Sequence, residues 1–200
     1  IGEWAFNTNE LTSFTIQGTI TSLGAAAFTK NKLPDATAFI YGRNSNGTIN
    51  DTILNSYGGA KDVDIVIPST VRTIGERSFA YCVTGDLVIP SGVTTIEEQA
   101  FYANFLNSIT IPGSVTSIGS AAFHGSNATN LTLNEGLITI HDQAFGYLYD
   151  TSLTIPASVT TIEWSAFFEN KLTSLTILGA NPQRFNSTWS LIQFPSNLMP

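Results

Sequence analysis

The hydrophobic positions of this chain recur in fixed blocks. In each block an aliphatic residue is followed four places later by a small residue and then by an aromatic ring, as in Ile96, Ala100 and Phe101. The rings stand at Phe6, Phe28, Phe79, Phe101, Phe123, Phe145 and Phe167. All but one of the steps between them are 22 residues long, and this constant step predicts a repeat protein made of stacked coils.

Each repeat also contains a short run in which apolar and polar residues alternate. Alternation is typical of a β-strand with one buried face, and the proline after such a run, Pro112 for example, ends the strand because it has no N–H. Runs of this kind begin at residues 14, 36, 65, 87, 109, 131, 153 and 175. One strand per repeat predicts a ladder of eight parallel strands. Thr95 and Glu98 fit a capping box, which predicts a single helical or 3-10 turn at the corner that carries the ring.

One step is longer than the others, because 51 residues separate Phe28 from Phe79. Tyr57 fits the ring position of an intervening coil and divides this step into 29 and 22 residues. Ile49 then fits the position that Val71 holds in the next coil, eight residues before the ring. The additional residues fall at about 42–48, where Gly, Asn and Ser are frequent, and they predict an inserted loop.

Together these features predict a right-handed solenoid of about eight coils over residues 1–178, an array that begins within a repeat. The aromatic rings are expected to stack in a buried row, which we call the spine. Residues 179–200 break the pattern and are expected to cover the last coil as an irregular C-terminal cap.

The motif that runs from Ile111 and Pro112 through Val115 and Ile118 to Phe123 resembles the BspA-like subclass of leucine-rich repeats. The resemblance implies a leucine-rich-repeat solenoid from a bacterial surface or secreted protein, which binds host or matrix components and carries further repeats or domains. In that family a Cys or Asn commonly follows the ring by three residues, and such a side chain is expected to hydrogen-bond the turn of an adjacent coil. Here that position holds Asn9, Asn31, Cys82, Asn104, Ser126 and Asn170, whereas Ala60 and Leu148 depart from it.

Composition and charge narrow the class of partner. Only 12% of the residues are charged, and eight Lys and Arg against fifteen Asp and Glu give a net charge of −7. The segment from Ser78 to Asn170 contains eight acids and no Lys or Arg, so nucleic acids and anionic lipid surfaces are disfavoured. No run of 18 apolar residues is present to insert into a membrane. The low charge and the many Thr, Ser and Asn residues point to an extracellular or cell-surface location.

No catalytic, metal-binding or cofactor-binding residues are predicted. The single Cys permits no internal disulfide, and two His residues cannot alone form a zinc site. The sequence contains no nucleophile with a nearby base, no phosphate loop and no metal-ligand spacing. It therefore predicts a protein that is not an enzyme and needs no cofactor.

The first candidate binding surface consists of outward positions on the predicted strands. It comprises Ser108, Thr110, Asn130, Thr132, Ser152 and Thr154. A solenoid face of this kind is suited to protein recognition or adhesion. Threonine also suits any exposed strand, so the same pattern fits a surface without a ligand.

The second candidate surface is a set of aromatic residues outside the spine. It comprises Tyr102, Tyr147, Trp164 and Phe168. Rings about one coil apart would stack on sugars or anchor a partner, unless they only pack the corner of the solenoid.

The third candidate surface is the inserted loop, because loops on a rigid scaffold often carry function. Its residues are Tyr41, Arg43, Asn44 and Asn46. Three functions remain open: adhesion to a host or matrix protein, glycan binding through the aromatic residues, and a passive spacer that displays another domain.

Overall fold

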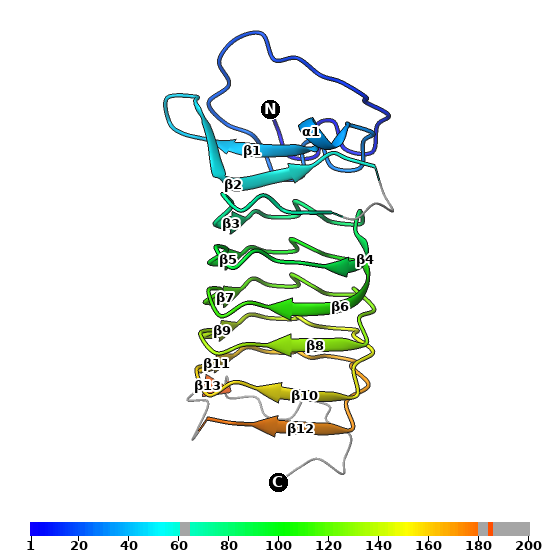
Figure 1. Cartoon of the computed structure of the whole chain (residues 1–200), viewed down its shortest axis with the longest axis vertical. Helices are drawn as coiled ribbons and strands as arrows, with labels where there is room; N and C mark the ends of the chain where they lie inside the picture. The colour runs from blue at the N-terminus through cyan, green and yellow to red at the C-terminus, as the bar shows by residue number, and fades with distance from the viewer. Residues whose placement is uncertain (61–64, 180–183, 186–200) are drawn as a thin grey trace.

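The computed structural model describes residues 1–60, 65–179 and 184–185. Successive coils are stacked along one axis, with the N-terminal coils at the top of Figure 1. A ladder of parallel strands follows one side of the stack. It consists of two sheets, one with β4 (Thr84–Leu87), β6 (Phe105–Ile111) and β8 (Asn130–Leu133), the other with β10 (Ser152–Ile155) and β12 (Ser174–Ile177). The predicted solenoid with a parallel strand ladder is confirmed.

A second parallel ladder lies at the other end of each coil. It contains β3 (Thr73–Ile74), β5 (Thr95–Ile96), β7 (Ser117–Ile118), β9 (Thr139–Ile140) and β11 (Thr161–Ile162). The sequence predicted one strand per repeat, but the regular coils form two. The reason is that the two residues before the turn are extended and pair with the equivalent residues of the coils above and below.

The turn that carries the spine ring is not helical, so the helical turn and its capping box were wrong predictions. Gln99 has a left-handed φ of 53°, and Ala103, four residues later, has a φ of 51°. The N–H groups of Gln99 and Phe101 donate to the carbonyl oxygens of Ser120 and Ala122 in the next coil, at 2.9 and 2.8 Å. A helix would use these donors within its own coil. Stacked coils offer them partners one repeat away instead.

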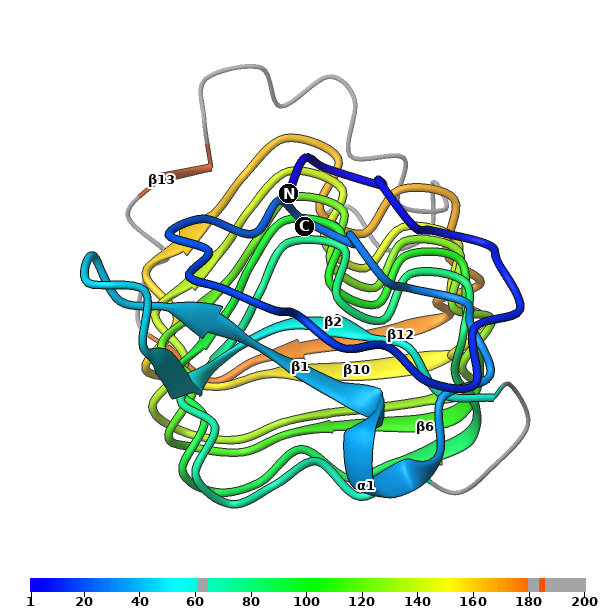
Figure 2. The ribbon, with the colours of Figure 1, turned by 90° about the horizontal axis from the view of Figure 1, so that it is seen from above.

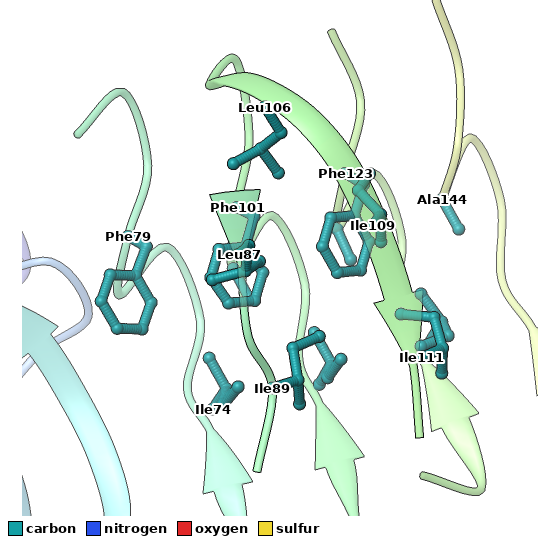
Figure 3. Packing of buried hydrophobic residues seen from close by; sticks show 14 of the residues in the cluster. Ile74, Phe79, Leu87, Ile89, Phe101, Leu106, Ile109, Ile111, Phe123 and Ala144 are labelled. Atoms are coloured by element: carbon teal, nitrogen blue, oxygen red, sulfur yellow. The ribbon is translucent and has the colours of Figure 1, made fainter. Parts of the chain in front are cut away.

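The buried spine is confirmed for the regular coils. Six rings from Tyr57 to Phe167 stack in succession, with centroids 5.0 to 5.6 Å apart. Phe79, Phe101 and Phe123 have no exposed surface, and Figure 3 shows them one after another within the apolar core. Phe28 instead stacks on Phe6 and Phe14, at 5.1 and 4.7 Å. The regular stack therefore has about six coils, fewer than the eight predicted.

The polar position three residues after the ring also behaves as expected. Asn104 is buried, accepts a hydrogen bond from the Val83 N–H at 2.9 Å and donates to the Phe79 carbonyl at 3.1 Å. Ser126 donates to the Phe101 carbonyl at 3.1 Å in the same way. These side chains join each coil to the preceding one at a point where no water reaches the backbone.

The inserted residues form the tip of a β-hairpin. The helix α1 (Asp35–Ala38) leads into β1 (Phe39–Arg43), which pairs antiparallel with β2 (Ile49–Tyr57). The hairpin lies at the N-terminal end of the stack, and its turn projects beyond the outline of the coils in Figure 2. No strand forms at residue 14 or 36, and at 65 only Val66 makes an isolated bridge, to Val88.

The register assigned to the longer coil was also wrong. Ile49 is 61% exposed, whereas Leu54 is fully buried and pairs with Ile74. Thr52 accepts the Arg72 N–H at 2.8 Å, just as Arg72 accepts the N–H of Thr94 one coil further on. The step from Thr52 to Arg72 is 20 residues, so this coil has lost two residues at the corner before Tyr57 while gaining the hairpin.

The predicted C-terminal cap, residues 179–200, lies almost wholly outside the described residues. The short strand β13 (Arg184–Phe185) pairs in parallel with β11. Within the described part of the chain, no helix is both long and apolar enough to cross a membrane.

Candidate recognition surfaces

The strands β6, β8, β10 and β12 form one flat, polar face, which we call the strand face (Figure 1). Their side chains alternate, so that Ile109 and Leu131 point into the core while Thr110 and Thr132 are exposed. The register is exact within each pair of strands: Ser108 of β6 pairs with Asn130 of β8, and Ser152 of β10 pairs with Ser174 of β12. All six predicted residues of the first surface therefore lie on this face.

Hydroxyl groups on the strand face are used differently from those at the second ladder. At the second ladder, the hydroxyls of Thr94 and Thr116 donate to backbone carbonyls of the preceding coil, at 3.3 and 3.4 Å. On the strand face, Thr132 donates only a 3.5 Å bond to the neighbouring Asn130 side chain. The Ser108 hydroxyl on the strand face does join two coils, because it donates to the Asp86 side chain at 3.2 Å. The threonine side chains at 110, 132 and 154 are exposed.

The strand face has an apolar end that the sequence analysis did not include among the candidates. Val66 and Val88 occupy the outward position that holds threonine in later coils, and they are 79% and 71% exposed. They lie side by side through an isolated parallel bridge. The sequence contained a signal for this apolar end, because Val66 and Val88 replace the threonine that later coils have at the same position.

The predicted aromatic surface forms a continuous row of rings outside the spine. Each coil contributes one ring, and the aromatic row consists of Tyr81, Tyr102, His124, Tyr147 and Phe168. Neighbouring ring centroids are 5.0 to 5.5 Å apart. The structure thus brings the predicted Tyr102, Tyr147 and Phe168 together with Tyr81 and His124, which follow the spine ring by one or two residues in the same way. Trp164 is 47% exposed but takes no part in these ring contacts.

The rings of the aromatic row are not coplanar. Tyr102 and His124 are stacked with their planes 4° apart, whereas Tyr81 and Tyr147 are turned by 69° from their neighbours in this stack. The turned rings are the more open, at 44% and 45% exposure. Burial lowers the pKa of His124, which opposes a charge in the middle of the row.

The hairpin residues are mostly engaged in holding the turn. Asn44 donates from its side chain to the Thr48 hydroxyl at 3.0 Å, and Asn46 accepts from the same hydroxyl at 2.7 Å. Tyr41 and Arg43 are half-buried on β1. Burial, and to a smaller extent the nearby Asp51, raises the pKa of Tyr41. Asn44 and Asn46 are exposed, so the tip alone is open to a partner.

Cys82 is 1% exposed in the position that Asn104 holds one coil later, which is the environment of a structural residue. In the described ranges, no group of three or more His, Cys, Asp and Glu side chains could hold a metal ion.

A family model and three solved structures are similar to this chain. The family model, described as BspA type leucine rich repeat region, matches residues 1–85 and 48–173 with six copies. A leucine rich cell surface protein from Faecalibacterium prausnitzii is 25% identical, with a TM-score of 0.59 over 85% of this chain and 47% of that one. No curated protein matches the chain significantly.

Two further structures share the fold. The pneumococcal vaccine antigen PcpA is 23% identical, with a TM-score of 0.52 over 88% of this chain and 42% of that one. A leucine-rich repeat protein from Eubacterium ventriosum is 21% identical, with a TM-score of 0.51 over 86% of this chain and 68% of that one. The chain spans less than half the length of the first two structures.

Proposed function

Because the chain belongs to the BspA-type leucine-rich repeat family, we propose that it is a non-enzymatic protein-recognition module of a surface or secreted protein. A similar protein from Faecalibacterium prausnitzii is described as a leucine rich cell surface protein, which supports this location. Adhesion to a host or matrix protein is the specific role that we infer. The module would act within a longer protein, since the chain corresponds to 47% of that relative.

The strand face is the observation that carries the proposal. Four strands, in register within the pairs β6–β8 and β10–β12, present two rows of small polar side chains. The row that includes Thr110 ends in the exposed pair Val66 and Val88. A polar surface with an apolar end is the usual composition of a protein interface that is not permanent. The rigid coils hold these side chains in place before binding, which lowers the entropy lost on association.

The test is to add charge to the strand face and to measure binding to an array of purified host and matrix proteins. The triple variant Thr110→Glu, Thr132→Glu and Thr154→Glu changes three exposed side chains without touching the core. A control with the same added charge carries Ser69→Glu, Ser91→Glu and Thr160→Glu, which are exposed positions outside the strand face.

The proposal is supported if a protein on the array binds the native chain and the control variant but does not bind the strand-face variant. Equal binding by both variants would place recognition elsewhere, with the hairpin tip around Asn44 and Asn46 as the next surface to test. An array without any bound protein would favour the passive spacer.

A further inference from the structure

Beside the two middle rings of the aromatic row, small residues leave a strip without large side chains, which we call the gap. Residues 81, 103, 125 and 147 are equivalent positions in four successive coils, and all four have a left-handed φ, between 51° and 68°. The outer two are Tyr81 and Tyr147, whereas Ala103 and Gly125 stand between them. A Cβ built on Gly125 would have only the Ala103 Cα within 4 Å, so the space above Gly125 is open.

The gap has an aromatic wall and aromatic ends. Tyr102 and His124 stand beside Ala103 and Gly125 in the same two coils, and their rings are stacked on each other. Tyr81 and Tyr147 meet this stack in T-shaped contacts, and their side chains remain 44% and 45% exposed. The ammonium of Lys30 lies over the Tyr81 ring, 5.0 Å from its centre, so this end of the gap carries a cation.

We propose that this gap binds an extended, neutral β-1,4-linked glycan that runs along the solenoid axis, with one sugar per coil. The spine rings place successive coils 5.0 to 5.6 Å apart, close to the length that one pyranose ring adds to such a chain. One sugar stacks on Tyr81, two lie over Ala103 and Gly125, and a fourth stacks on Tyr147. Rigid tyrosine rings supply large contact areas at low entropy cost, which suits the C–H faces of sugars.

The charge around the gap selects for an uncharged glycan. No Lys or Arg lies between Ser78 and Asn170, and Glu169 occupies the next equivalent position after Tyr147. Lys30 lies at the Tyr81 end, but the coils that carry Ala103, Gly125 and Tyr147 have acids and no Lys or Arg, so a polyanionic glycan would meet negative potential along them. The aromatic row and the strand face are separate surfaces, so this site does not rest on the protein-recognition role proposed above.

The test is titration of the chain with N-acetylchito-oligosaccharides and cello-oligosaccharides from the dimer to the hexamer, followed by calorimetry or NMR. In at least one series, affinity should rise up to the tetramer and then level off, because four coils span the gap. Carboxymethylated cello-oligosaccharides, which have the same backbone with negative charge, should bind more weakly than their neutral counterparts.

Tyr147→Ala should lower the affinity about tenfold or more, in the range of an aromatic anchor. The matched control is Tyr149→Ala, because Tyr149 is 52% exposed two residues away but makes none of the ring contacts of the row. Ala103→Gln fills the gap and leaves Tyr102 and His124 in place, and it should also weaken binding. This variant replaces Tyr147→Ala in the test if Tyr147→Ala does not fold. The absence of binding to both hexamers, equal affinity for dimer and hexamer, or equal losses in the Tyr147 and Tyr149 variants would overturn the proposal.

Discussion

The regular coils between residues 65 and 179 and the N-terminal part, residues 1–60, use the same repeat with different results. In the regular coils, the strands, the left-handed turns and the rings all recur at 22 residues, and each element pairs with its equivalent in the next coil. In the N-terminal part, Tyr57 packs against Phe39 from the hairpin, at 5.2 Å and tilted by 55°. Its ring still stacks on Phe79, so the regular spine begins there.

The contrast indicates which parts of a repeat tolerate a change of length. The hairpin adds residues on an open side of the stack, where they displace nothing. At the buried corner the same coil is two residues short, and Arg77 from the next coil reaches across. Its guanidinium pairs with Glu3, lies 5.7 Å from the Trp4 ring and donates to Gln99 at 2.7 Å. The buried ring and the hydrogen bonds between coils therefore keep the same places in the stack, whereas the number of residues between them differs from coil to coil.

The largest expected difference between the two regions concerns the spine. Phe123→Ala should lower the free energy of unfolding by about 3–5 kcal/mol, because the ring is fully buried between Phe101 and Phe145. Phe6→Ala should cost less than about half of that, because Phe6 is 42% exposed. Urea denaturation measures both values. Equal losses would mean that the N-terminal rings are as well packed as the regular spine.

A smaller effect is expected at the polar position that links the coils. Asn104→Ala should cost about 2 kcal/mol, because it leaves the Val83 N–H and the Phe79 carbonyl buried without their partner. Asn9→Ala removes an exposed side chain and should change stability by less than about 0.5 kcal/mol. Thermal and urea unfolding of both variants provide the comparison. Similar values would show that the buried Asn is replaceable by water.

The smallest effect has the opposite sign and tests the left-handed turn. Ala121 has a φ of 52°, which is unfavourable for a residue with a Cβ, so Ala121→Gly should stabilise the chain by about 1 kcal/mol. The neighbouring Ala122 is fully buried and is not left-handed, and Ala122→Gly should destabilise by about 1 kcal/mol. The two melting temperatures should move in opposite directions, and a shift in the same direction would contradict the assigned turn.

The sequence alone determined the repeat, the buried spine and the position of the linking side chains. These features depend on which side chains are buried, and burial is visible as spacing: Phe101 and Phe123 are fully buried at the predicted period, and Asn104 makes the predicted hydrogen bonds. The outward residues of the strand face follow from the same alternation. The family resemblance, drawn from the motif between Ile111 and Phe123, also holds for the chain.

The tertiary structure decided where the backbone groups find their partners and how the surface rings are turned. The capping-box pattern at Thr95 predicted a helical turn, but the Gln99 N–H pairs with Ser120 in the next coil, a partner that no local pattern specifies. The register of the longer coil likewise depends on the pairing of Leu54 with Ile74, which outweighs the spacing of Ile49. The orientations of Tyr81 and Tyr147 are set by T-shaped contacts with rings one coil away. Burial is encoded along the chain, whereas hydrogen-bond partners and ring orientations are set between coils that only the stacked fold brings together.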